Sequence, residues 1–281
     1  MLRTRSPLRA LSSSDRDAAL EMCARDPAAN VFLAARILEG GMESRAASVY
    51  GHRTDGRLDS MVWASANIVP VGLDRETAPM YAERLRRWRS RTASLLGPTD
   101  QVLGLWDELA PVWGTPRAVR SRQPLLATLV PPSARGVEVD PRVRPARPSE
   151  VDLVLPAAVH MFTAEIGYPP FAGSSRAYRA SLQSLIDDGR TYVVVEGGRV
   201  VFKADVGSVA LGCAQLQGVW LAPDLRGQGR SVAAMAAVVE QVMNDHAPYV
   251  TLYVNDFNTA ARATYRHIGM TEVGGYTTVL L

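Results

Sequence analysis

The strongest chemical signal in the sequence is a glycine-rich segment, Arg226–Ser231 (RGQGRS), that follows an apolar run and opens a helix-like run. We expect residues 213–221 to form a strand and the helix to extend from Gly229 to about Asp245. The N-terminus of a helix offers unpaired backbone N–H groups and a partial positive charge. Such a strand-to-helix turn either binds an anion or is a tight turn without a ligand.

The glycines and arginines of this segment favour a phosphate ligand. Gly227 and Gly229 lack Cβ atoms, so a phosphate can approach their backbone closely, and Arg226 and Arg230 add positive charge. The dinucleotide-binding fingerprint GxGxxG is absent here, and no Lys-Ser/Thr pair of a P-loop follows the glycines. The pattern therefore predicts a pyrophosphate cradle of another type.

A second polar segment, residues 254–270, follows about thirty residues later. We expect a strand before it and a helix over Thr259–Ile268 within it. Asn258 directly precedes this helix and can cap it. Tyr265 lies on the helix, where it is either a core aromatic side chain or a phenol placed to donate a proton.

Together the two segments resemble the signatures of the GNAT superfamily of N-acetyltransferases. The family's coenzyme A motif is a Gln or Arg, two residues, a Gly, one residue, and a Gly or Ala; Arg226 and Gly229 match it, and Ser231 takes the last place. The second signature is a strand, an Asn, a helix with a Tyr, then a Gly and usually a Phe, where this chain has Met270. The resemblance covers roughly residues 140–281 and implies a GNAT fold, an α/β domain with a mixed sheet.

The resemblance also implies roles for individual residues, with acetyl-coenzyme A as cosubstrate and no metal. Tyr265 would protonate the departing thiolate, and Asn258 would bond the coenzyme near its pantetheine arm. Backbone groups would hold the pantetheine arm and the pyrophosphate. The implied cofactor-binding set is Val219, Leu221, Arg226, Gly227, Gln228, Gly229, Arg230, Ser231 and Asn258.

The general base is the least specified part of the expected site. Many relatives carry an acidic residue on the strand before the cofactor loop, where this chain has the amide Gln215. Glu165, at the end of an expected helix, completes the catalytic set, while Asp205 and a base acting through water stay open as alternatives. Lys203 and Asp205 alternate along one strand face, which favours a surface ion pair. His160 is assigned a structural role.

The remaining elements of the second region predict a mixed α/β order. Two glycines between apolar runs favour a tight hairpin, because such a turn requires positive φ angles. The expected elements are helices over 149–166 and 174–188, a hairpin turning at Gly197-Gly198, and a terminal hairpin turning at Gly274-Gly275.

The first region, to about residue 130, also predicts α/β structure but shows no phosphate-binding loop. The expected elements are a helix after Asp26-Pro27 that ends at Gly40-Gly41, a strand over 58–71, an arginine-rich helix over 76–91, a turn at 97–100, a helix over 101–113 and a strand over 124–130. The proline-rich stretch 131–148 predicts a linker. Resemblance to two-domain actinobacterial acetyltransferases, including mycothiol synthase-like proteins, implies a degenerate GNAT-like domain at 1–132 without a cofactor motif, and the GNAT domain at 138–281.

Composition and charge place the 281-residue chain among ordinary globular proteins, with 47% hydrophobic residues and a net charge of +3. Nucleic-acid binding is not favoured, because the run of arginines between residues 84 and 91 is better explained as a solvated helix face. Cys23 and Cys213 predict buried, reduced thiols. The N-terminal residues lack the apolar core of a secretory signal, and no apolar run is long enough to span a membrane, so we expect a cytoplasmic protein.

The sequence thus favours an acetyl-coenzyme A-dependent N-acetyltransferase, an acyltransferase that transfers groups other than aminoacyl groups. Its acceptor would be an amine of a small metabolite or of a protein. The main alternative is a non-catalytic coenzyme A-binding regulatory protein, which the amide at Gln215 supports. A nucleic-acid adaptor that uses the arginine-rich helix is a weaker alternative.

Overall fold

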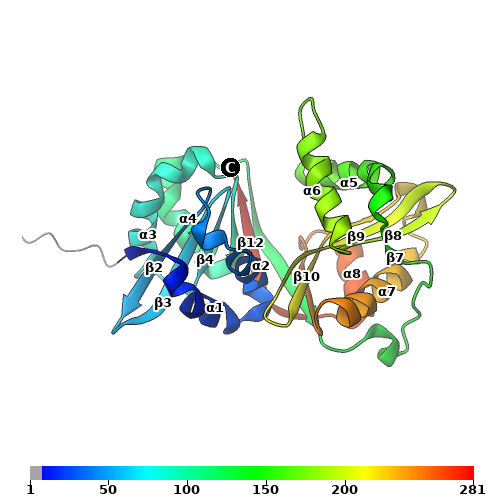
Figure 1. Cartoon of the computed structure of the whole chain (residues 1–281), viewed down its shortest axis with the longest axis horizontal. Coiled ribbons are helices and arrows are strands. Elements are labelled where there is room, and N and C mark those ends of the chain that lie inside the picture. Colours follow the sequence, from blue (N-terminus) through cyan, green and yellow to red (C-terminus); the bar gives the residue numbers. More distant parts are fainter. Residues whose placement is uncertain (1–7) are drawn as a thin grey trace, which may run out of the picture. The chain divides into compact units, whose positions relative to one another are not determined.

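The protein was analysed as a computed structural model that describes residues 8–281. Residues 1–7, and with them part of the stretch considered for a secretory signal, lie outside the described residues. The chain divides into two compact units, which are described separately below (Figure 1). Unit 1 comprises Met1–Leu125, Tyr253–Phe257 and Glu272–Leu281, and unit 2 comprises Leu126–Leu252 and Asn258–Thr271. The sequence patterns place the last two segments of unit 1 in the C-terminal domain instead.

Unit 1 is an α/β unit whose strands follow the order β1-β2-β3-β4-β5-β12. Only β4 and β5 pair in parallel; the other neighbours are antiparallel. Side chains from α3, α4 and the strands form its apolar core, with Tyr81, Leu85 and Leu105 fully buried. The elements are β1 (Leu8–Leu11), α1 (Arg16–Ala24), α2 (Pro27–Leu38), β2 (Ser48–Thr54), β3 (Arg57–Ala64), β4 (Asn67–Val71), α3 (Ala78–Leu85), β5 (Ser94–Pro98), α4 (Thr99–Trp113), β6 (Ala118–Thr128) and β12 (Thr271–Leu280).

Unit 2 is a mixed sheet in the order β11-β10-β9-β8-β7, with α5 and α6 on one face and α7 and α8 on the other (Figure 1). The pair β10–β11 is parallel and the other pairs are antiparallel. The elements are β7 (Arg144–Pro145), α5 (Val151–Ile166), α6 (Arg176–Asp187), β8 (Thr191–Glu196), β9 (Arg199–Ala210), β10 (Cys213–Leu221), α7 (Arg230–Asp245), β11 (Tyr249–Tyr253) and α8 (Thr259–His267).

The two parallel strands of unit 2 separate halfway along β10. Only Cys213, Ala214 and Gln215 pair with β11, whereas β10 pairs with β9 as far as Leu221. Along the second half of β10, one edge therefore lacks a strand partner among the described residues. Free N–H and C=O groups on such an edge can accept an extended ligand as an added strand.

Local turn chemistry explains where the sequence-based expectations hold. The hairpin between β8 and β9 turns at Gly197 (φ 55°) and Gly198 (φ 74°), which confirms the two-glycine turn. The helix expected from Gly229 begins as α7 at Arg230, and Gly229 is its N-cap with a left-handed φ of 74°. Cys23 and Cys213 are buried, as expected, and neither forms a disulfide.

Three expected elements are corrected by the structure. The terminal hairpin is one strand, β12, because Gly274 and Gly275 are extended and do not take the positive φ of a turn. The single strand expected over 58–71 is a hairpin of β3 and β4. The helix expected over 76–91 ends at Leu85 and continues as a 3₁₀ segment.

The arginines of that helical segment mostly have partners within unit 1. Arg84 stacks over Tyr50 at 4.8 Å, and Arg91 over Trp88 at 4.5 Å. Arg86 forms an ion pair with a glutamate three residues earlier. These contacts accord with a solvated helix face whose side chains pack locally.

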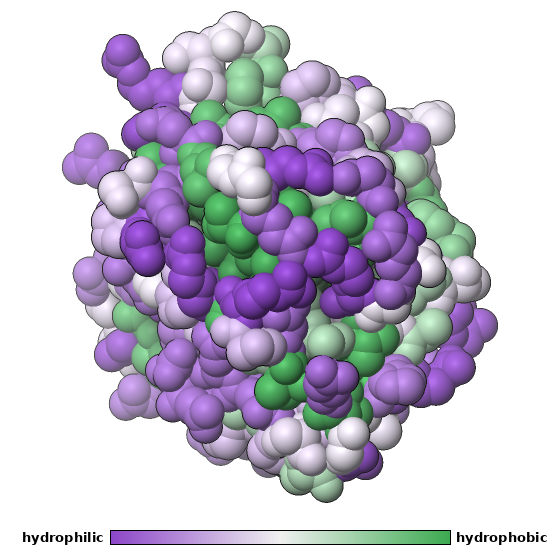
Figure 2. All heavy atoms as spheres, turned by 90° about the vertical axis from the view of Figure 1, so that its right-hand side faces the viewer, coloured by the Kyte–Doolittle hydropathy of each residue, from purple (hydrophilic) through white to green (hydrophobic). Residues whose placement is uncertain are grey.

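The surface shows no extended apolar face in the view of Figure 2. Hydrophilic side chains cover most of that face, and apolar side chains gather in a few places framed by hydrophilic ones. Within residues 8–281, no helix is both long and apolar enough to cross a membrane.

Candidate functional site

The glycine-rich segment of unit 2 has the geometry of an open cradle. Gly227 and Gly229 both adopt left-handed φ angles, 75° and 74°, which favour glycine. A Cβ placed on either residue would meet no atom within 4 Å, so the space beside both backbones is open. Directly after them, α7 starts, and the first N–H groups of a helix have no carbonyl partner of the i−4 ladder. The residues present therefore fit a pyrophosphate.

The polar side chains of the segment fix its shape. Arg226 Nε donates to the Leu221 carbonyl at 3.1 Å, and Gln228 Nε2 donates to the Asp224 carbonyl at 3.0 Å. Arg230 forms an ion pair with Glu196 at the end of β8. Its hydrogen bond is the main reason why the pKa of the Glu196 carboxyl lies below its ordinary value. Glu196 is not among the residues predicted from the sequence, because no motif marks it.

A hydrogen bond joins the first turn of α7 to α8. Ser231 Oγ lies 3.1 Å from Thr264 Oγ1, and Thr264 directly precedes Tyr265 in α8. The Ser231 hydroxyl, which departs from the family's Gly or Ala, thus contacts the neighbouring helix. Asn258 caps α8 by accepting from the Ala261 N–H at 3.2 Å, as its position suggested.

Tyr265 is buried and Glu165 lies near enough to influence it. Tyr265 is 6% exposed, and burial raises the pKa of its phenol above the ordinary value; the charge of Glu165 raises it further. The ring therefore keeps its proton at neutral pH. Among the residues that the structure describes, none shares a hydrogen bond with the Tyr265 hydroxyl. Of the two residues assigned to catalysis, Glu165 lies near the end of α5 and Tyr265 lies in α8.

The other candidates for a base are constrained. Gln215 is 6% exposed, and its Nε2 has no hydrogen-bond partner within residues 8–281. His160 Nδ1 accepts from Trp220 Nε1 at 3.0 Å, which leaves the proton of neutral His160 on Nε2. Lys203 and Asp205 do pair, but the expected surface location is wrong: both are buried, at 0% and 5% exposure, because α5 and α6 cover this part of β9.

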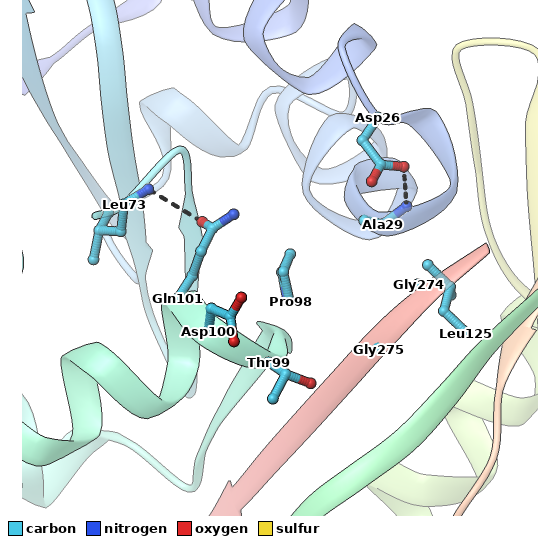
Figure 3. Close-up of a pocket in the computed structure, with 10 residues that line it drawn as sticks. All are labelled: Asp26, Ala29, Leu73, Pro98, Thr99, Asp100, Gln101, Leu125, Gly274 and Gly275. Atoms are coloured by element: carbon cyan, nitrogen blue, oxygen red, sulfur yellow. Dashed lines mark hydrogen bonds between the residues drawn. The ribbon is translucent and has the colours of Figure 1, made fainter. Parts of the chain in front are cut away.

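Unit 1 contains a separate pocket with a different lining (Figure 3). It has a volume of about 570 Å³ and lies where β5 leads into α4. The carboxylates of Asp26 and Asp100 and the amide of Gln101 line it, and Gln101 Oε1 accepts from the Leu73 N–H at 3.2 Å. No glycine-rich loop is present at this turn, and two carboxylates disfavour a pyrophosphate. This lining does not fit the phosphates of a coenzyme.

Comparisons with protein families match both parts of the chain. Residues 159–270 match the model of the acetyltransferase (GNAT) family. Unit 2 contains a GNAT acetyltransferase domain. Residues 47–154 match a domain family of unknown function, DUF4081. A search of curated proteins gives no match.

Solved structures show the GNAT fold over both units. A GNAT-family acetyltransferase from Colwellia psychrerythraea has a TM-score of 0.55, 12% identity, and coverage of 98% of this chain and 99% of that chain. A tandem GNAT protein from the clavulanic acid biosynthesis pathway has a TM-score of 0.57 and 14% identity, with coverage of 97% of this chain and 98% of that chain. A GCN5-related N-acetyltransferase from Sphaerobacter thermophilus has a TM-score of 0.61 and 18% identity, with coverage of 96% of this chain and 93% of that chain.

Because these likenesses span nearly the whole chain, the N-terminal part also resembles the GNAT fold. The GNAT match begins after the start of α5 and ends just before β12, so it includes the cradle and α8. The family and the fold support an acyl-coenzyme A-dependent acetyltransferase.

Proposed function

We propose that this GNAT protein is an N-acetyltransferase that uses acetyl-coenzyme A to acetylate an amine of a small metabolite or of a protein. The reaction is assigned to the domain spanning residues 138–281, and residues 1–132 form a GNAT-like domain without a cofactor motif. The observation that supports this proposal most is a hydrogen bond between the end of the cradle and the helix that carries the proposed acid. Ser231 bonds Thr264, which directly precedes Tyr265 in α8.

The cradle and the free edge of β10 would hold acetyl-coenzyme A. The amides of Gly227 through Ser231 would bind the pyrophosphate at the start of α7, with Arg226 adding charge. Backbone groups of Val219 and Leu221 lie on the part of β10 beyond its pairing with β11, where they would take the pantetheine arm. The Leu221 carbonyl already accepts from Arg226, but a carbonyl oxygen has two lone pairs. Asn258 would bond the arm while it caps α8.

When bound, acetyl-coenzyme A supplies an activated acetyl group as a thioester. Tyr265 would hold its proton at the phenol oxygen and give it to the sulfur as the thiol leaves, and burial keeps that proton in place. Glu165 would attract a cationic amine and take its proton, directly or through water. The negative charge of Glu165 also discourages ionisation of Tyr265.

A second candidate function is a coenzyme A-binding regulator without turnover. Gln215 favours it, because an amide cannot accept the proton of an ammonium group and stands where relatives carry an acid. Release of free thiol from acetyl-coenzyme A separates the two functions. The assay uses a panel of small primary amines and of peptides with free N-termini or lysines.

The N-acetyltransferase predicts amine-dependent thiol release that Glu165→Gln reduces. A matched control is Glu240→Gln, which changes an acidic side chain that bonds the Ser133 N–H at 2.7 Å, at the other end of α7 from the cradle. Saturable coenzyme A binding with no thiol release for any amine would favour the regulator instead.

A further inference from the structure

The one lysine of the chain occupies a fully buried position. The chain has 31 lysines and arginines together, and all but Lys203 are arginine. Lys203 is 0% exposed and Asp205 is 5% exposed, two residues along β9. Burying an ion pair is costly, and similar apolar side chains usually serve stability as well or better. The pair therefore calls for a role other than stability.

Each charged group of the pair is held by a further contact. Lys203 Nζ pairs with Asp205 Oδ2 and lies 3.4 Å from the Gly218 carbonyl oxygen. Asp205 Oδ1 accepts from the Thr191 hydroxyl at 2.9 Å. Since both carboxylate oxygens have donors, Asp205 is poorly placed to act as the general base.

The Lys203–Asp205 pair on β9 lies opposite a β-bulge in β10. Gln217 pairs with Asp205 and Trp220 with Lys203, so Gly218 and Val219 together lie opposite Ala204, and β10 has one extra residue here. Gly218 adopts a φ of 59°. A Cβ at this glycine would lie 2.8 Å from Asp205 Oδ2 and 3.2 Å from Lys203 Nζ, so any larger residue would have to displace the pair.

The contact with Lys203 orients the peptide between Gly218 and Val219. In a planar trans peptide the carbonyl and the N–H point in opposite directions. With the Gly218 carbonyl turned toward Lys203, the Val219 N–H points away from the pair. It lies on the part of β10 that has separated from β11 and leads into the cradle.

We propose that Lys203 and Asp205 are positioning residues that hold this bulge so that the Val219 N–H faces the acyl thioester. This inference rests on the proposed function, which places acetyl-coenzyme A along β10. A preorganised N–H donor aimed at a carbonyl oxygen stabilises the charge that develops there during acyl transfer. Val219 is the one residue of the bulge among the proposed coenzyme contacts, and the pyrophosphate cradle is formed by other residues, so the pair acts mainly on the transfer step and changes coenzyme affinity little.

The test uses Lys203→Met/Asp205→Leu, which removes both charges and leaves no buried charge unpaired. The matched control is Arg179→Met/Asp152→Leu, which removes the ion pair between α5 and α6, whose N–O distance is 2.7 Å. Circular dichroism checks that both variants fold. Hydrogen exchange of residues 216–222 is measured on the ligand-free protein, coenzyme A affinity by calorimetry, and kcat by thiol release.

We expect faster exchange of residues 216–222 in the Lys203/Asp205 variant and a kcat at least about tenfold lower. The Kd for coenzyme A stays within about threefold of wild type, and the control variant matches wild type in all three measurements. Unchanged exchange overturns the inference, and so does faster exchange with unchanged kcat. If wild type releases no thiol with any amine, the proposed function fails. In that case hydrogen exchange of residues 216–222 alone decides whether the Lys203–Asp205 pair holds the bulge.

Discussion

The hydroxyl oxygens of Ser231, in the first turn of α7, and Thr264, in α8, lie 3.1 Å apart. This hydrogen bond connects the helix that ends the cradle with the helix that carries Tyr265. In the family motif the place of Ser231 belongs to Gly or Ala, neither of which could make the bond. The chain thus ties its two signature segments together by a contact that the motif does not require.

A double-mutant cycle with Ser231→Ala and Thr264→Val measures this connection. A hydrogen bond between two partly buried hydroxyls contributes about 0.5–1.5 kcal/mol, so we expect a coupling energy in that range. Urea unfolding of the four proteins gives the value. Strictly additive single-variant effects would show that the bond contributes nothing to stability.

Gly229→Asp should abolish coenzyme A binding in a protein that still folds. Aspartate tolerates the left-handed conformation and is a good N-cap, so α7 should form, but its charge would lie where the pyrophosphate is proposed to bind. Calorimetry should show affinity weakened at least about a hundredfold, or about 2.7 kcal/mol. Gly136→Asp is the matched control, because Gly136 also has a left-handed φ, 77°, and open space around it. Unchanged affinity in folded Gly229→Asp would place the site elsewhere.

Tyr265→Phe keeps the buried ring and removes only the hydroxyl. If the phenol protonates the leaving thiolate, kcat falls by at least about tenfold while the KM for acetyl-coenzyme A changes much less. Tyr192→Phe is the control, since Tyr192 is also a buried tyrosine of unit 2. Turnover within twofold of wild type would remove Tyr265 from the catalytic residues and leave the cradle assignment intact.

The sequence predicted unit 2 well because its boundaries are set by local chemistry. Gly197-Gly198 and Gly229 need positive φ angles wherever they stand in the fold, and Asn258 caps the residues next to it. Tyr265 could be assigned because its spacing from the cradle matches a family signature.

Unit 1 was predicted less completely because its strands depend on distant partners. The strands β1 and β2 and the helix α1 were missed, and the last two residues of β5, Gly97 and Pro98, were assigned to a turn. The strand β12 pairs with β5, more than 170 residues away, so neighbouring residues could not show that Gly274-Gly275 is extended.

The burial of Lys203 and Asp205 could not be predicted from the sequence either. The alternation of Lys203 and Asp205 gives a shared face but not what covers it, and α5 and α6 come from a separate stretch of chain. The charged side chains of these two residues by themselves suggested an ion pair on the surface. Their burial follows from the tertiary structure, in which Lys203, Asp205 and Thr191 satisfy one another.

The stability of the protein should fall between pH 4.5 and 2 partly through Glu150. Two hydrogen bonds of 2.7 Å from Arg144 lower the pKa of Glu150 from 4.5 to about 2, and the Arg147 N–H adds to this. A lowered pKa means that the charged form stabilises the fold above pH 4.5 and that this contribution is lost as the pH falls toward 2.

Glu150→Gln should therefore lower the free energy of unfolding at pH 7 by about 2 kcal/mol. The difference from wild type should shrink as the pH falls, because the wild-type carboxyl also becomes neutral. Urea unfolding across the pH range measures it. Asp152→Asn, which alters an exposed ion pair with Arg179, should show a smaller change. A difference that stays constant with pH would contradict the assignment.

Transfer of a labelled acetyl group measures the proposed N-acetyltransferase reaction itself. The protein is incubated with acetyl-coenzyme A labelled in its acetyl group and with the amine panel, and mass spectrometry identifies every labelled product, with Gly229→Asp as the control. We expect that wild type moves the label to the nitrogen of at least one amine and that the Gly229→Asp variant moves none. Transfer that survives in folded Gly229→Asp, or coenzyme A binding without label on any amine, would contradict it.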